Sequence, residues 1–81
     1  MNISQKVINQ IQKVLEKNQM KGTIEEETKL FQAFTIDSLI AIEILVSMEE
    51  IFNIVIEDDD LSLELLETPK TLINYIDNKL N

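Results

Sequence analysis

The chain has 81 residues and a mass of 9.4 kDa, with 15 acidic residues against 7 basic ones, all lysines, and a formal net charge of −8. It has no cysteine and no histidine, which excludes disulfides and Cys-ligated metals, and its acidity makes nucleic acid a poor partner because phosphate backbones repel it. Its hydrophobic content of 44% is enough for one packed core, so we expect a single domain over residues 1–81.

The sequence offers no obvious membrane segment. Its most apolar stretch, residues 39–48, is about half as long as a bilayer span requires and contains Glu43. The first ten residues, MNISQKVINQ, carry polar side chains throughout, unlike the apolar core of a secretory signal. We therefore expect no membrane span and a cytoplasmic protein.

Helical spacing of apolar residues predicts a first helix over about residues 4–18, with Ser4 as its N-cap. The apolar residues are Ile3, Val7, Ile8, Ile11, Val14 and Leu15. Thr23 and Glu26 then have the spacing of a capping box, which predicts one short turn.

A long loop is predicted between this helix and the next. A loop of this length needs apolar anchors if it is to stay on the core. We expect Leu30, Phe31 and Phe34 to be those anchors.

A second helix is predicted over residues 38–52, with Asp37 as its N-cap. At about 100° per residue, five of its apolar side chains fall within one arc that is wide enough to be a core face. They are Ala41, Ile44, Leu45, Met48 and Phe52.

The opposite side of this helix is also apolar. An apolar stripe of Leu39, Ile42 and Val46 is interleaved there with carboxylates. The three carboxylates of this face are Glu43, Glu49 and Glu50. An 81-residue bundle is too thin to bury one helix on every side, so we expect the stripe to be exposed and to contact other proteins. The alternative is that the long loop covers it.

The C-terminal third continues the helical pattern. The segment NIVIEDDD is predicted to be an extended connection, since the chain has no second strand to pair with it, and residues 61–66 are predicted to form a short third helix. Thr68-Pro69 is typical of a helix start. The apolar face of that last helix is Leu72, Ile73, Ile76 and Leu80. The fold class is therefore all-α, a small four-helix bundle of three longer helices and a short third one, with a long loop between helices 1 and 2.

Ser38 lies at the start of the second helix, where free backbone N–H groups and the helix dipole favour a phosphate on its hydroxyl. The alternative is that Ser38 is only a capping or first-turn serine. The residues around it favour the first interpretation, because DSLIAIEILVSMEEIF closely resembles the segment around the attachment serine of acyl carrier proteins and of related peptidyl and D-alanyl carriers. The matching residues are Asp37, Ser38, Leu39, Glu43, Glu49, Glu50 and Phe52. The resemblance covers about residues 24–77, including TKLFQAFTIDSL before the serine and ETPKTLINYI after it.

The resemblance implies that a phosphopantetheinyl transferase moves 4′-phosphopantetheine from coenzyme A to Ser38, flanked by Asp37 and Leu39. The thiol of this cofactor would carry an acyl group as a thioester. A chain without Cys or His has no thiol or imidazole of its own, so the reactive group must be brought in, and we expect no enzymatic activity.

The resemblance also implies partners. Acyl-loading and acyl-transferring enzymes with basic docking surfaces, from fatty acid, polyketide or a related dedicated biosynthesis, would contact the apolar stripe and be steered by its three carboxylates. Such contacts should be transient, and we expect a monomer that binds no nucleic acid.

Several positions depart from the carrier patterns. Thr35 stands where a glycine is usual, and Ile40 and Ile51 stand where carriers of bulk fatty acid synthesis have acids. Leu39 and Leu66 replace a methionine and a tryptophan usual in D-alanyl carriers. We therefore favour a carrier for a dedicated pathway.

The acidic segment after residue 56 suggests a second interpretation, a calcium-binding loop. An EF-hand loop starting at Asp58 needs glycine and glutamate where Leu63 and Pro69 stand, which excludes it. An unmodified docking module with the same fold stays an alternative, and within the family so does a D-alanyl or peptidyl carrier. A pocket for an aliphatic chain among Ile44, Met48, Ile56 and residues 61–66 is a further hypothesis, although these residues would equally make an ordinary core.

Overall fold

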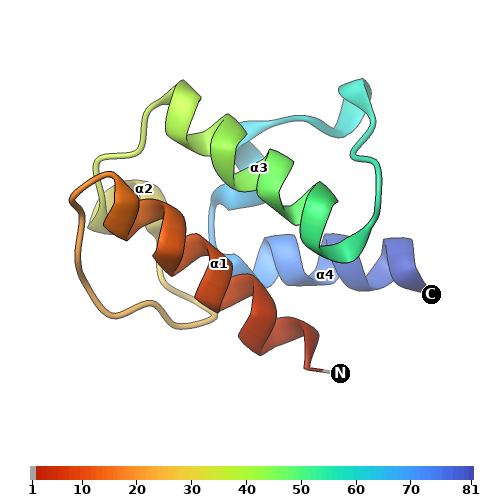
Figure 1. Cartoon of the computed structure of the whole chain (residues 1–81), viewed down its shortest axis with the longest axis horizontal. Helices are drawn as coiled ribbons and strands as arrows, with labels where there is room; N and C mark the ends of the chain where they lie inside the picture. The colour runs from red at the N-terminus through yellow and green to blue at the C-terminus, as the bar shows by residue number, and fades with distance from the viewer. Residues whose placement is uncertain (1) are drawn as a thin grey trace.

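Three long helices form the body of the chain in a computed structural model, which describes residues 2–81 apart from the side chain of Asp58 (Figure 1). The long helices are α1 (Ile3–Lys17), α3 (Ser38–Phe52) and α4 (Pro69–Leu80), and the short ones are α2 (Leu30–Ala33) and the 3₁₀ turns η1 (Asp58–Asp60) and η2 (Leu63–Leu66). The all-α prediction is confirmed. The predicted short third helix exists as η2, but it is a single 3₁₀ turn that starts two residues later than expected.

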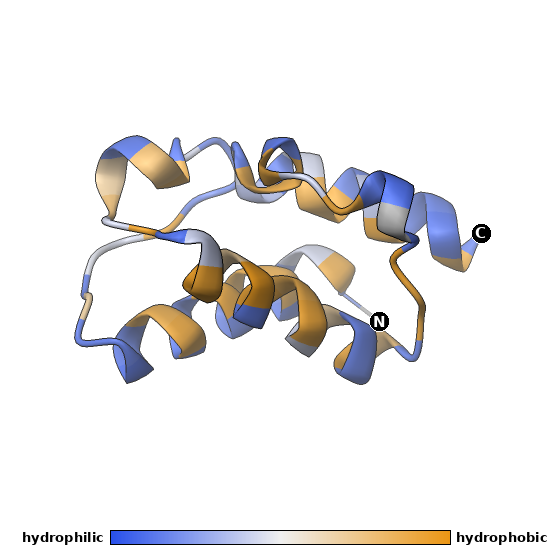
Figure 2. Ribbon diagram, turned by 90° about the horizontal axis from the view of Figure 1, so that it is seen from above, coloured by the Kyte–Doolittle hydropathy of each residue, from blue (hydrophilic) through white to orange (hydrophobic). Residues whose placement is uncertain are grey.

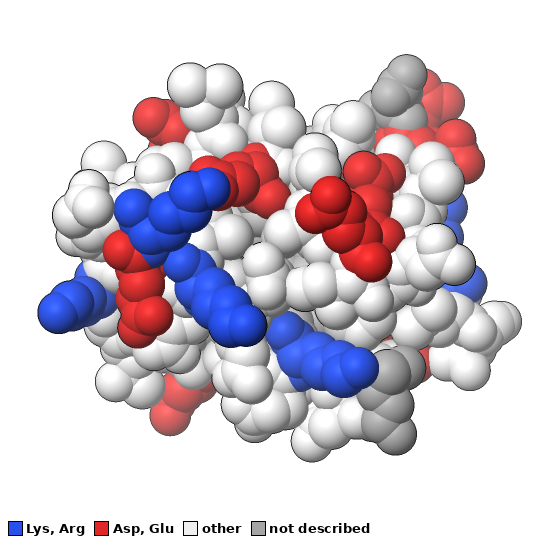
Figure 3. Space-filling model, viewed as in Figure 1, with Lys and Arg blue, Asp and Glu red and all other residues white. Residues whose placement is uncertain are grey.

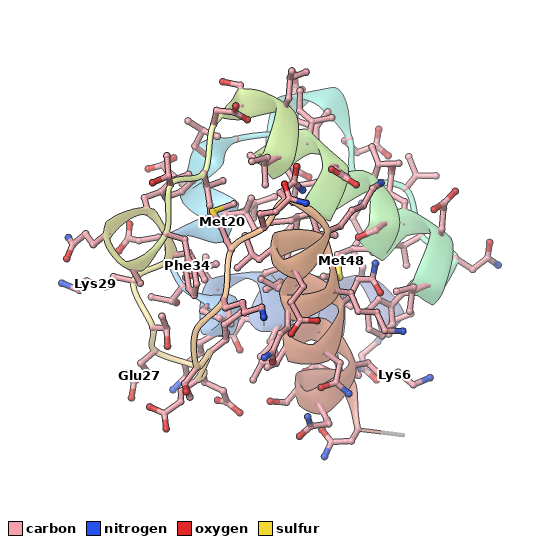
Figure 4. The ribbon with its side chains drawn as sticks, turned by 60° about the vertical axis from the view of Figure 1, so that its left-hand side comes forward. Lys6, Met20, Glu27, Lys29, Phe34 and Met48 are labelled. Atoms are coloured by element: carbon pink, nitrogen blue, oxygen red, sulfur yellow. The ribbon has the colours of Figure 1, made fainter. Side chains whose placement is uncertain are left out.

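The core lies where α3 and α4 pack against α1 (Figure 2). All five residues of the predicted core face of α3 are buried there. They meet Val7, Ile11, Val14 and Leu15 of α1 and Leu72 and Ile76 of α4. Met48 lies in this interior, beside α1 (Figure 4). The hydrophobic periodicity of the sequence therefore identified the core correctly.

The first helix begins one residue earlier than predicted, because Asn2 and not Ser4 is its N-cap. The Asn2 side chain accepts the Gln5 N–H at 3.0 Å. An asparagine caps as well as a serine, and its position before Ile3 brings that apolar residue into the helix. Ser4 instead lies in the first turn, where its hydroxyl donates to the Glu26 carboxylate at 2.6 Å. The residue predicted to cap the helix thus fastens the long loop to it.

The long loop is anchored by two of the three predicted residues. Leu30 is fully buried and Phe34 half-buried, but Phe31 is exposed. The turn of α2 was not predicted. Its first residue, Leu30, is buried in the core, and the extended residue that follows it, Phe34, packs against the core, while Phe31 within the turn is exposed. Phe34 and Met20 both lie along the inner side of the loop (Figure 4).

The predicted short turn is present at residues 26–27, but Thr23 and Glu26 do not form the capping box that was expected to hold it. No helix starts at Thr23, and the turn nearby is held by Thr28, whose hydroxyl accepts the Glu25 N–H at 2.8 Å. A capping box needs a following apolar helix to stabilise, and EEETK supplies none. The loop is fixed instead by backbone bonds to the start of α4, from Leu30 N–H to the Glu67 carbonyl (3.1 Å) and from Lys70 N–H to the Glu26 carbonyl (2.8 Å).

The connection after α3 has neither helix nor strand over residues 54–57, but the end of the segment predicted to be extended, residues 58–60, forms η1. Thr68 caps α4 and Pro69 is its first residue, which confirms that start signal. Leu72 and Ile76 are buried and Ile73 is half-buried, but Leu80 is exposed because the last turn extends past the core. The Tyr75 hydroxyl donates to Asp60 at 2.9 Å and so ties η1 to α4.

Candidate functional site

The start of α3 leaves the Ser38 hydroxyl unused. Asp37 is the N-cap, with extended backbone, and its carboxylate accepts the Ile40 N–H at 2.9 Å. Ser38 is the first helical residue; it is exposed, and its hydroxyl has no hydrogen-bond partner among the described residues. Ser38 is therefore not the cap, and of the two roles in that alternative only the first-turn position applies.

The local electrostatics suit an anion bonded to this hydroxyl. The first backbone N–H groups of a helix have no acceptor within it, and the aligned peptide dipoles make this end positive. Asp37 satisfies only one of these groups, at Ile40. A phosphodiester on Ser38 would therefore lie near N–H groups that still lack an acceptor.

The apolar stripe is exposed, as predicted. Leu39 is 78% exposed, Ile42 54% and Val46 45%. The long loop does not cover them, because its anchors and backbone bonds hold it against the core and the start of α4. The stripe begins beside Ser38 and follows the outer face of α3, so a protein that binds it also reaches the serine.

The three carboxylates of this face differ in their surroundings. Glu43 is paired with Lys17 at 2.7 Å, and this hydrogen bond lowers the pKa of Glu43 below its ordinary value and raises the pKa of Lys17. Glu49 is half-buried and accepts the Ile56 N–H at 2.8 Å, which fixes the chain after α3. Glu50 is exposed and, among the described residues, has no ion-pair partner. Only Glu50 is therefore fully available to another molecule.

An apolar groove lies beside Ser38, between α3 and residues 61–63. It has a volume of about 320 Å³ and is lined by Ser38, Ala41, Ile42, Leu45, Val46, Glu49, Leu61, Ser62 and Leu63. The predicted pocket also included Ile44, Met48 and Ile56, but these three do not line this groove and are buried in the core. Leu61 and Leu63 are exposed instead and form the far wall of the groove.

Sequence reasoning missed the Lys17–Glu43 pair, and it placed residues 61–66 in a pocket with the wrong opposite wall, which is Ile42 and Val46 and not Ile44 and Met48. The Lys17–Glu43 pair joins residues 26 apart, and no local pattern indicates it. The alternation Leu61-Ser62-Leu63-Glu64 did carry a signal, because a period of two places both leucines on one side of an extended segment.

The described residues contain no cluster of three or more His, Cys, Asp or Glu arranged to hold a metal ion. The EF-hand alternative begins at Asp58, whose side chain lies outside the described part of the chain. None of the described helices has the length and apolar character needed to cross a membrane.

Comparison with protein-family models gives a match over residues 5–76 to the family described as the phosphopantetheine attachment site. The matched range runs from the first turn of α1 to the last buried residue of α4 and includes Ser38, the apolar stripe and the groove. Neither the curated proteins nor the solved structures gave a match.

Proposed function

The chain belongs to the phosphopantetheine attachment site family, whose members are carriers with covalently attached 4′-phosphopantetheine, and on this premise we propose that Ser38 bears this group and that acyl groups are carried on it. The cofactor supplies a terminal thiol, which a chain without cysteine lacks. One observation carries the assignment to Ser38: its hydroxyl is exposed and unpartnered at the first turn of α3.

The neighbouring residues have positioning roles in this proposal. Asp37 is engaged with the Ile40 N–H, so it fixes the helix start and with it the direction of the Ser38 hydroxyl. Leu39 is the most exposed apolar residue beside the serine and gives an enzyme its nearest apolar contact. The chain itself performs no catalysis in this proposal.

The apolar groove supports an aliphatic cargo. It opens at Ser38, and its walls at Ile42, Leu45, Leu61 and Leu63 are apolar. Removing a hydrocarbon chain from water against these walls is favourable, by about 0.8 kcal/mol for each buried CH₂. A carrier of fatty acid, polyketide or a related dedicated biosynthesis fits this surface.

The outer face of α3 supports docking to enzymes. The apolar stripe supplies contact area, and Glu50, with Glu43 and Glu49 beside it, attracts basic side chains. The enzymes in this proposal are a phosphopantetheinyl transferase and the enzymes that load and transfer the acyl group.

The test is the intact mass of the protein before and after incubation with coenzyme A and a broad-specificity phosphopantetheinyl transferase. We expect a gain of one phosphopantetheine in the unsubstituted chain and in Ser47→Ala, a matched serine of α3 whose hydroxyl bonds the Ile44 carbonyl. Ser38→Ala should gain nothing. A gain of mass in Ser38→Ala would show that the attachment site is another residue. No gain of mass in any of the chains would favour the unmodified docking module.

A further inference from the structure

A second groove lies between α1 and α3, on the other side of the apolar stripe. It has a volume of about 310 Å³, and its lining includes Lys13 and Lys17 from α1 and Glu43, Val46 and Glu50 from α3. Val46 belongs to the apolar stripe and lines both grooves. The second groove is therefore continuous with the proposed docking face.

The two walls of this charged groove have opposite signs. The α1 sequence contains three lysines and one glutamate, whereas α3 contains three glutamates and no lysine. In Figure 3 a row of basic side chains crosses α1 below the acidic groups on α3. In a chain with a net charge of −8, α1 is thus a locally basic strip beside an acidic helix.

Only part of this charge is satisfied within the molecule. Lys17 and Glu43 neutralise each other across the groove at 2.7 Å. Lys13 and Glu50 are both exposed, and in the part of the chain that the structure describes neither has an ion-pair partner. The groove therefore presents one cation and one anion to any protein that covers it.

An enzyme that acts on Ser38 is large enough to cover both charges. Ser38 and Glu50 are twelve positions apart on α3, about 18 Å at 1.5 Å per residue. A standard interface buries about 800 Å² on each partner, which is a patch roughly 30 Å across. A protein seated along the apolar stripe thus extends over Val46 to the groove.

We propose that the phosphopantetheinyl transferase docks across α3 onto α1, with an anionic side chain facing Lys13 and a cationic one facing Glu50. This inference rests on the proposed function, because it concerns the enzyme that modifies Ser38. A uniformly basic docking surface is repelled by Lys13, so charge complementarity requires an acid at that position.

The two modes of docking predict opposite effects of one substitution. If the transferase recognises only negative charge on the carrier, Lys13→Glu speeds the modification, since the carrier becomes more negative. If the transferase recognises both the positive Lys13 and the negative Glu50, Lys13→Glu slows the modification. Lys70→Glu, at an exposed lysine on α4 that does not line the groove, makes the same change in net charge and is the matched control.

The experiment measures kcat/KM for transfer from coenzyme A to the unsubstituted chain, Lys13→Glu, Lys70→Glu and Glu50→Lys, with the broad-specificity transferase at low and high salt. We expect Lys13→Glu and Glu50→Lys each to lower kcat/KM about three- to tenfold at low salt, mainly through KM, with a smaller effect at high salt. Lys70→Glu should leave kcat/KM unchanged or raise it slightly. Lys13→Gln, a milder variant, should give a smaller loss, and the thermal unfolding of each variant checks the fold.

A rate for Lys13→Glu that equals or exceeds that of Lys70→Glu would overturn the inference and leave the proposed function intact. An unsubstituted chain that gains no mass would overturn both.

Discussion

Both faces of α3 carry large apolar side chains, but these side chains have opposite surroundings. Ile44 on the inner face is fully buried, whereas Ile42 on the outer face is 54% exposed, although both are isoleucines of one helix two positions apart. The inner face meets α1 and α4, whereas in the described chain the outer face is flanked only at its edges, by Lys17 on one side and by Leu61 and Leu63 on the other. Apolar residues of this helix therefore stabilise the fold on the inner face, and on the outer face they are available to contact another protein.

The largest effect should come from the inner face. Ile44→Ala removes fully buried atoms and leaves a cavity, so we expect the free energy of unfolding to fall by about 2–5 kcal/mol in urea denaturation. The matched variant Ile42→Ala should change it by less than about 0.5 kcal/mol. Equal losses for the two would mean that the outer face is also core.

A smaller effect on stability is expected at Asp37, the N-cap of α3. Asp37→Ala removes the side-chain cap on the Ile40 N–H and should cost about 1 kcal/mol, measured by thermal unfolding. It should also slow the modification of Ser38, since that residue follows directly. Asp37→Asn keeps the hydrogen-bond acceptor and should retain most of the stability. If Asp37→Asn loses as much stability as Asp37→Ala, the charge of Asp37 matters and not its capping bond.

The hydrogen bond that ties η1 to α4 offers a test through pH. Burial and the hydrogen bond to Asp60 raise the pKa of Tyr75 from 10.0 to about 12. The folded state thus holds the phenol proton more tightly than the unfolded state, so this contribution is complete below pH 10 and is lost as the pH rises through about 12. We expect stability to fall over this range.

Absorbance can follow this titration directly, because Tyr75 is the only tyrosine. Tyr75→Phe should lower the free energy of unfolding by less than about 1 kcal/mol at pH 7 and remove the part of the alkaline decline that Tyr75 causes. A tyrosine that titrates near 10 in the folded protein would contradict the bond to Asp60 and the fixing of η1 that depends on it.

The smallest effect on stability should come from the outer face itself. Val46→Glu places a charge on a side chain that is 45% exposed, so the free energy of unfolding should stay within about 0.5 kcal/mol. Transfer of phosphopantetheine to Ser38 should nevertheless be slower, because the apolar contact is lost. Glu43→Lys should likewise weaken docking, and it also breaks the pair with Lys17. Transfer rates that do not change would show that the transferase does not recognise this face of α3.

Local signals explain what could be predicted. Asp37 caps α3 and the helix has its predicted bounds, because the cap, the apolar period and Asn53 in a left-handed conformation after Phe52 are all encoded within a few residues. Thr68-Pro69 marked the start of α4 for the same reason. Where two caps compete nearby, as Asn2 and Ser4 do, the sequence did not discriminate.

By itself the sequence determined the long helices, the buried face of α3 and the position of Ser38 at its first turn, since periodicity and capping act over one or two helical turns. Only the tertiary structure decided that Glu43 is paired with Lys17, that Phe31 is exposed and that the groove lies beside Leu61 and Leu63. These features depend on contacts between segments far apart in the chain, and their geometry exists only once the helices have packed.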